Sequence, residues 1–460
     1  MARPLEDTLP GSLASPTRGR SAAGTPARVP QAVSNVTMAS RSAETWGRSR
    51  NPASRPLVAS NTMRGLDVPE PTEDFTADPV ELFFDLAFVF AFSQLVFHLV
   101  HHPTWTGATE AWLLFAMLWM AWSTFTWSAN AVSGNGRVVR IVFLIATAAT
   151  LPAAGGITTA FEDGGGGAAF AISVSVIMAM ALALQLFAHE AGSAQRLSVI
   201  RYAVPNIVAM VLYIVGAYLD GEVRVAFWLL GLSSILYGTI RAGSSDWIVR
   251  IGHFAERHGL ILIIALGEVV VAIGIALVDS LDEAGSLPGS VVVALVAAGS
   301  FAGLLWWAYF DRLQPALEHR GEQLEGRPRG WYARDVYTYL HAPIVSGVII
   351  SAAALEEIIL HPSDPVPLAF RVMLAGGLLM YLLGTVAAVA RAYGFVVKER
   401  IVASAVVVAL VALGGSWDGV VLLFFVDVVL LVMLLAEFVR IERPRPSTEP
   451  ADEAQTREPQ

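Results

Sequence analysis

The chain contains no cysteine among its 460 residues. This absence excludes disulfide bonds, thiol catalysis, iron–sulfur clusters and cysteine-ligated zinc, and it leaves the redox compartment open. Charged residues are also scarce: they make up 15% of the chain, whereas 55% is apolar, and the mean hydropathy is +0.58. In a water-soluble chain, about a quarter of the residues are charged. We therefore expect the lipid bilayer to be the solvent in which this chain folds.

Long apolar runs recur along the chain with short breaks between them, most of them close to the ~20 residues that a helix needs to cross the hydrocarbon layer. They lie at residues 80–101, 110–131, 138–160, 168–188, 199–219, 223–241, 254–278, 288–310, 335–358, 366–391, 399–415 and 418–439. The pattern predicts an all-α polytopic integral membrane protein of about twelve transmembrane helices. The short run at 399–415 is the weakest of the set.

The composition divides the chain into three parts. Residues 1–76 are rich in Ser, Ala, Pro, Thr and Arg and lack the apolar stretch of a secretory signal. Such a segment buries too little apolar surface to offset its ordering entropy, which predicts a disordered tail rather than a targeting or binding segment. Residues 77–440 form the membrane domain, with six helices in 80–241 and six in 254–439. Residues 441–460 are expected to be a disordered C-terminal tail.

The breaks between the runs alternate in charge. One set is basic and contains Arg137, Arg140, Arg196, Arg201, Arg241, Arg250, Arg312, Arg320, Arg327, Arg329, Arg334, Arg391, Lys398 and Arg400. The other set is mainly acidic and contains Glu162, Asp163, Asp220, Glu222, Asp279, Asp282, Glu283 and Asp364. It also holds Arg224, and Arg371 lies close to the start of its helix. Because basic loops stay in the cytoplasm, the alternation predicts that both termini are cytoplasmic.

Short matching segments indicate an internal repeat. Residues 219–221 read Leu-Asp-Gly and residues 417–419 read Trp-Asp-Gly, at a separation of 198 residues. Arg137 and Arg334 open equivalent runs at a separation of 197 residues. We interpret the chain as a six-plus-six duplication whose halves are parallel, because an even number of spans restores the orientation.

Carboxylates inside the apolar runs are the first candidates for function, because charge at membrane depth is costly. Glu81 and Asp85 are four residues apart and so share one face of the first helix. Glu81 has an interfacial alternative, since a carboxylate near a helix N-terminus is favourable. Glu268 and Asp427 lie in the middle of the seventh and the last run. Glu268 needs a partner from another helix, a proton or water.

A second group, His253, Glu256 and Arg257, opens the seventh run. We expect it at the cytoplasmic entrance, either with a functional role or in an interhelical salt-bridge network. Arg257 and Glu268 cannot pair, because eleven residues of helix separate them by about 16 Å.

Metal and cofactor sites are not indicated. Three histidines near the outer end of the first run, at positions 98, 101 and 102, have no placed carboxylate and make no metal site. We predict no metal ligands, no cofactor and no catalytic residues. Trp119, Trp122 and Trp127 are interpreted as part of an aromatic belt at the membrane interface.

Two motifs carry a family resemblance. Residues 81–90 read Glu-Leu-Phe-Phe-Asp-Leu-Ala-Phe-Val-Phe, and residues 253–268 begin His-Phe-Ala-Glu-Arg-His-Gly and end Leu-Gly-Glu. In order and spacing they resemble the bacterial low temperature requirement A family, over residues 77–440. The resemblance implies a multi-pass protein of the bacterial inner membrane that is linked to growth in the cold. It implies no reaction.

Three classes of function stay open. A transporter or channel for a small solute or ion would use the intramembrane carboxylates for coupling. A membrane sensor or assembly factor would use the same polar residues only to hold helices together. A lipid-modifying enzyme would need a clustered acid, base or metal set, and the spacing of His253 and Glu256 fixes none. We expect a transporter rather than an enzyme. Its expected partners are the lipid bilayer and an unidentified small solute or ion, and no nucleic acid. The oligomeric state is open.

Overall fold

The computed structural model describes residues 62–63, 66–67, 76–132, 136–242, 247–284 and 286–442. The predicted disordered tails, 1–76 and 441–460, lie almost entirely outside these residues. The described part begins with two short strands, β1 (Thr62–Met63) and β2 (Leu66–Asp67), which pair antiparallel. Every further element in the described ranges is helical.

All twelve predicted apolar runs are helices. Those of the first half are α1 (Pro79–His101), α2 (Trp105–Ala129), α3 (Arg137–Gly155), α4 (Gly166–Ala188), α5 (Ala194–Ala217) and α6 (Gly221–Ala242). Those of the second half are α7 (Ile251–Ala284), α8 (Gly289–Phe310), η2 (Ala333–Leu340) with α11 (His341–Leu360), α12 (Leu368–Tyr393), α13 (Lys398–Leu413) and α14 (Gly419–Glu442). Two further helices, α9 (Leu313–Glu322) and α10 (Gly326–Tyr332), lie between α8 and η2 and match no predicted run. The segment η2 is π-helical and leads directly into α11.

Within the described ranges, ten helical stretches are long and apolar enough to cross a membrane. This confirms an all-α polytopic membrane protein in a lipid bilayer. The two remaining predicted spans differ from the ten. Helix α13 has only 16 residues, and α2 lies inside the bundle against α1, α4, α6 and α11.

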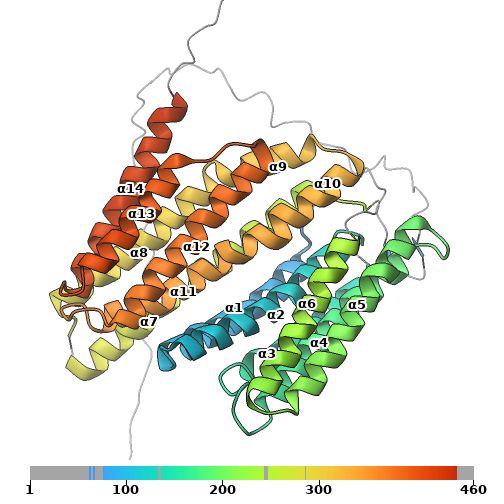
Figure 1. The fold of residues 1–460 in the computed structure, drawn as a ribbon, viewed down its shortest axis with the longest axis horizontal. Helices are drawn as coiled ribbons and strands as arrows, with labels where there is room; N and C mark the ends of the chain where they lie inside the picture. Colours follow the sequence, from blue (N-terminus) through green and yellow to red (C-terminus); the bar gives the residue numbers. More distant parts are fainter. Residues whose placement is uncertain are drawn as a thin grey trace, which may run out of the picture. The chain divides into compact units, whose positions relative to one another are not determined.

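Several neighbour pairs recur in the two sets of six helices. The first set contains α1–α2, α1–α3, α3–α4, α4–α5, α5–α6 and α2–α6; the second contains α7–α8, α7–α11, α11–α12, α12–α13, α13–α14 and α8–α14. The sets also differ, because α2–α4 in the first and α8–α11 and α11–α14 in the second have no counterpart of similar extent. Figure 1 shows α3 to α6 together on one side of α1 and α2, with α12 to α14 on the other. The recurring pairs agree with the predicted duplication, which stays a prediction.

The predicted halves differ in length. Helices α9 and α10 lie between α8 and η2, whereas residues 130–136 alone join α2 to α3. Helix α7 also has 34 residues where α1 has 23. The stretch predicted as a single run at 335–358 includes a π-helical segment that the apolar pattern did not indicate.

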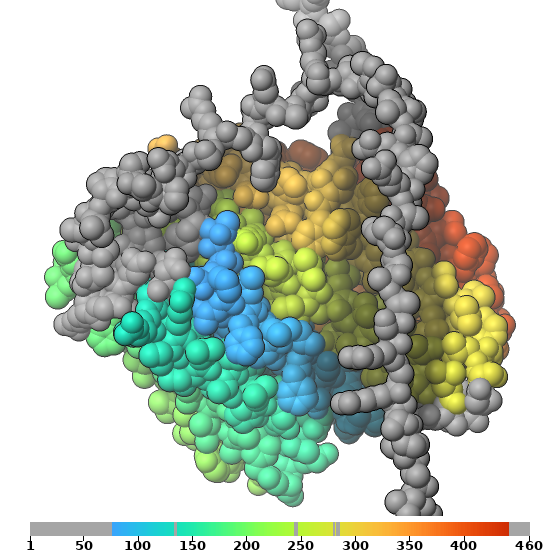
Figure 2. Space-filling model, turned by 180° about the vertical axis from the view of Figure 1, so that it is seen from behind, coloured from blue at the N-terminus to red at the C-terminus, as the bar shows by residue number. Residues whose placement is uncertain are grey.

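Helices α1 and α7 lie side by side where the two halves meet, and Figure 2 shows them as neighbours in blue and yellow-green. One side of α1 is buried through Phe84, Phe88 and Phe92. The opposite side exposes Phe83 and Leu86, at 50% and 57%. A helix with apolar residues on both sides is stable only where lipid covers the exposed one.

Candidate functional site

The start of α1 is fixed by a capping box. Asp78 is the N-cap and accepts a hydrogen bond from the backbone N–H of Val80 at 3.2 Å. Glu81 returns the contact, because its Oε1 accepts from the backbone N–H of Asp78 at 3.3 Å. Pro79 at the first helical position has no N–H that would need a partner. The box leaves the second oxygen of Glu81 available for a contact to another helix.

Arg257 of α7 binds both acidic residues of α1. Its Nε and Nη2 donate to the two oxygens of Asp85 at 2.9 and 2.6 Å, a bidentate pair. Its Nη1 donates to Oε2 of Glu81 at 2.5 Å. His253, one turn earlier in α7, lies with its Nε2 2.9 Å from the same Glu81 oxygen. These four side chains are called the α1–α7 network below.

A tryptophan from a third helix completes the network. Trp122 of α2 donates its indole N–H to Oδ1 of Asp85 at 2.8 Å. Trp122 is 1% exposed and Trp119 is 4% exposed. The aromatic-belt interpretation is therefore wrong for these two residues, which lie inside the bundle. Sequence reasoning missed Trp122 because nothing in its spacing distinguishes a buried indole from an interfacial one.

The α1–α7 network is fully buried, with no side chain more than 1% exposed. Two carboxylates face one guanidinium and one imidazole, so the charges balance when His253 is protonated. Desolvating such a group is costly, and only close geometry with further hydrogen bonds compensates for it. Here the bidentate Arg257–Asp85 pair and the Trp122 donor supply that geometry. Glu81 lies in the first turn of α1, as the interfacial alternative supposed, and it also belongs to this buried group.

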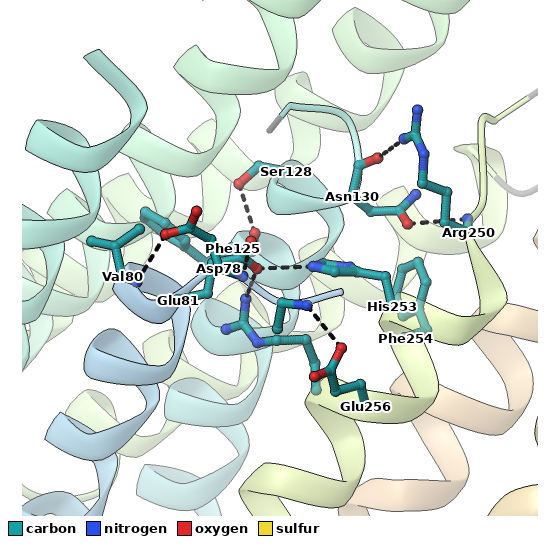
Figure 3. Close-up of polar contacts among 12 residues, drawn as sticks. Asp78, Val80, Glu81, Phe125, Ser128, Asn130, Arg250, His253, Phe254 and Glu256 are labelled. Atoms are coloured by element: carbon teal, nitrogen blue, oxygen red, sulfur yellow. Dashed lines mark hydrogen bonds and ion pairs between the residues drawn. The ribbon is translucent and has the colours of Figure 1, made fainter. Parts of the chain in front are cut away.

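Two further polar contacts lie beside the network, where the chain enters α1. The backbone N–H of Ala77 donates to Oε2 of Glu256 at 2.7 Å, directly before α1 begins. Arg140 of α3 lies 3.7 Å from Asp78. Figure 3 shows Glu81 and His253 facing each other, with Glu256 on the neighbouring turn of α7. Glu256 thus anchors the entry of α1 rather than joining the buried network.

Glu268 lies deeper along α7, away from the network. It is 2% exposed, and its Oε2 accepts from the hydroxyl of Ser93 of α1 at 2.9 Å. Its Oε1 is buried without a hydrogen-bond partner among the described residues. The predicted need for a partner from another helix is thus met on one oxygen only.

The structure places Asp427 apart from the other predicted site residues. It lies in α14, which packs on α8, α11 and α13. Its side chain is 9% exposed, and Oδ1 has no hydrogen-bond partner within the described part of the chain.

A buried group of aromatic and imidazole rings adjoins the network and was not predicted from the sequence. His258, directly after Arg257, packs edge-on against Trp122 at 4.9 Å between ring centroids. It also contacts Tyr337 of η2 and His341 of α11, at 5.1 and 5.0 Å. The four-residue spacing of Tyr337 and His341 was the only signal in the sequence. Tyr337 lies in the π-helical η2 and His341 begins α11 directly after it. Short π-helical segments are frequent at functional sites.

Comparison with known families decides the relationship of this chain. Residues 76–435 match the family described as bacterial low temperature requirement A protein (LtrA). The chain belongs to this family. The match spans α1 to most of α14, so it includes every residue of the α1–α7 network.

Among curated proteins, this LtrA-family chain is similar to an uncharacterized protein of Rhizobium meliloti. The two are 28% identical over 330 residues, which cover 69% of this chain and 78% of the relative. No solved structure matches. The two motifs that carry the resemblance are the two surfaces that contact each other, α1 from Glu81 and α7 from His253.

Proposed function

We propose that this LtrA-family protein transports a small solute or ion across the bacterial inner membrane, in support of growth in the cold, and that Glu268 is its coupling group. One observation carries the proposal. Glu268 is buried in the middle of a spanning helix, and one of its oxygens has no hydrogen-bond partner among the described residues. An ionisable residue at that depth marks a proton or ion pathway more often than a fold requirement.

The position of Glu268 between the halves supports the same function. It faces Ser93, so it lies at the contact of α1 with α7. In transporters built from repeats, coupling ions bind near the middle of the membrane at the interface between repeats. The α1–α7 network, at the predicted cytoplasmic end of the same interface, is held by hydrogen bonds among α1, α2 and α7 and would act as a fixed anchor.

Flux through purified protein in proteoliposomes tests the proposal. Gradients of H⁺, Na⁺ or K⁺ are imposed, and a dye enclosed in the vesicles reports ion entry for wild type, Glu268→Gln and the matched control Glu222→Gln. Glu222 lies exposed in the first turn of α6. We expect wild type and the control to pass one of these ions, and Glu268→Gln to fall at least about tenfold, because a neutral amide cannot exchange a proton and has no charge to balance a cation.

Complementation of a deletion strain at low temperature gives a second readout. Membrane abundance of each variant is measured in the same cells. If Glu268→Gln is present at wild-type abundance and restores growth fully, the carboxylate is structural and the proposal is wrong. A role as a membrane sensor or assembly factor then becomes the better explanation.

A further inference from the structure

An apolar groove lies between the two halves at the predicted outer end of the bundle. One of its walls comes from α1 and α2, and the other comes from α11 and α12. It consists of two adjoining volumes of about 210 and 60 Å³, and Ala108 and Met373 line both of them. None of the described lining residues belongs to the α1–α7 network, and neither Glu268 nor Asp427 is among them.

The groove runs inward by about the depth of one lipid leaflet. Along α2 its lining extends from Thr104, the N-cap, to Phe115, and eleven helical residues span about 16 Å. The hydrocarbon core of a bilayer is about 30 Å thick, so one leaflet contributes about 15 Å. Trp105 is exposed at the mouth, and tryptophan is typical of the membrane interface. The groove therefore begins near the lipid headgroups and ends near the middle of the membrane.

The lining of the groove suits hydrocarbon better than a polar solute. Among the described lining residues none is ionisable, and only Thr104 and Ser346 carry a hydroxyl group. Oγ1 of Thr104 accepts from the backbone N–H of Gly107 at 3.1 Å, and Oγ of Ser346 donates to the carbonyl oxygen of Ala342 at 2.8 Å. A polar solute would lose its hydration here and find few partners in return, whereas an apolar chain has no such cost.

The groove is open to the bilayer at its side. Leu368 and Val372 of α12 line it and are 65% and 38% exposed. Apolar side chains that are exposed on a spanning helix face lipid. Further in, the lining residues Leu95 and Ile349 are only 1% and 2% exposed. The same space thus leads from lipid-facing residues to residues that are buried between the halves.

A space of this size and polarity requires an apolar occupant. About 10–15 Å³ is enough to hold one water molecule, but an apolar cavity stays dry because water finds no hydrogen-bond partners in it. If the groove were empty, its lining would lose dispersion contacts. Lipid chains surround the open side at all times, so they can fill the groove without any diffusion through water.

We propose that this groove binds one acyl chain of a phospholipid from the predicted outer leaflet. The headgroup stays near Trp105, and the chain passes between Ala108 and Met373 and ends beside Phe115 and Ile349. The chain is then part of the packing between the two halves. This inference goes beyond the proposed transport and does not depend on it.

Photo-crosslinking of the full-length protein in nanodiscs tests the inference. The nanodiscs contain phosphatidylcholine with a trace of the same lipid that carries a diazirine at the end of one palmitoyl chain. We expect light to label Phe115 and Ile349, as mapped by mass spectrometry of peptides. Ile207 of α5 is the reference for lipid that merely surrounds the protein, because it is 52% exposed and lies about 15 Å from the outer end of its helix.

Two variants fill the groove from opposite walls. Ala108→Phe acts from α2 and Ala369→Phe acts from α12. In each, labelling of Phe115 and Ile349 relative to Ile207 should fall at least about fivefold, because close packing leaves no room for both the ring and a chain. The matched control Ala148→Phe adds the same ring at an exposed position of α3 outside the lining and should keep the ratio. The ratio is measured on one preparation, so a lower yield of protein does not change it.

The inference is wrong if only exposed residues such as Ile207 are labelled, or if the ratio survives in both filling variants. A wild-type protein that elutes as a dimer and shows no label at Phe115 and Ile349 would also refute it, because a second copy would then cover the groove. The transport proposal fails separately. Ion flux does not decide where a lipid chain lies, and labelling of Phe115 does not report on flux through Glu268.

Discussion

Glu81 and His253 are each the third residue of their helices, α1 and α7, and their side chains meet at 2.9 Å. Asp85 and Arg257 are each the seventh residue, and they meet at 2.6 Å. Both pairs are 172 residues apart. The two helices therefore run parallel and in register, as they must if an axis along the membrane normal relates the two halves.

Removal of the shared cation should destabilise the protein strongly. Arg257→Met leaves Glu81 and Asp85 buried without their guanidinium, and loss of one partner of a buried ion pair costs about 3–5 kcal/mol. We expect the free energy of unfolding, measured by detergent denaturation of the purified protein, to fall by that amount.

The matched control is Arg312→Met. Arg312 pairs with Asp311 while both side chains are 42% exposed, and an exposed pair contributes only about 0–1 kcal/mol. Equal losses in the two variants would contradict the network as described.

Trp122→Phe should weaken the network by removal of a single donor. A hydrogen bond to a charged group contributes about 1.5–3 kcal/mol, and Phe keeps most of the ring packing. Thermal unfolding in detergent should therefore show a clearly lower midpoint. Trp306→Phe, at a position 44% exposed, should leave the midpoint nearly unchanged, and a reversed order would show that Trp122 is merely packed.

The orientation of the chain can be measured directly, because there is no cysteine to remove. Glu162→Cys and Glu190→Cys each introduce one thiol at an exposed position, in the α3–α4 and α4–α5 connections respectively. From the alternation of loop charge, an impermeant maleimide added to spheroplasts should label Glu162→Cys at once and Glu190→Cys only after the membrane is opened. The reverse order would invert the predicted topology.

The apolar pattern predicted the helices well because span length is a local property of the sequence. The first run, 80–101, is α1 at residues 79–101, and the fourth, 168–188, is α4 at residues 166–188. Helices α9 and α10 were missed because they are too polar and too short to resemble a span. The π-helical turn of η2 was missed because the apolar pattern carries no signal that separates a π-helical turn from an α-helical one.

Which candidate residues pair with each other could not be predicted from the sequence. Glu81 and Asp85 were correctly predicted to share a face, which follows from helical spacing alone. This face meets Arg257 because α7, and not another helix, packs on α1 there. No local pattern in a single sequence shows which helix packs on which. The same holds for Ser93, whose hydroxyl reaches Glu268 from a helix that begins 172 residues earlier.

The unlike charges on α1 and α7 decide which halves can be partners. Two copies of the first half, meeting at this axis, would place Glu81 and Asp85 of one copy against the same carboxylates of the other. Two copies of the second half would bring Arg257 against itself. Like charges buried at such distances repel strongly, so neither half could assemble with its own kind, and covalent linkage in one chain guarantees that each molecule contains one of each.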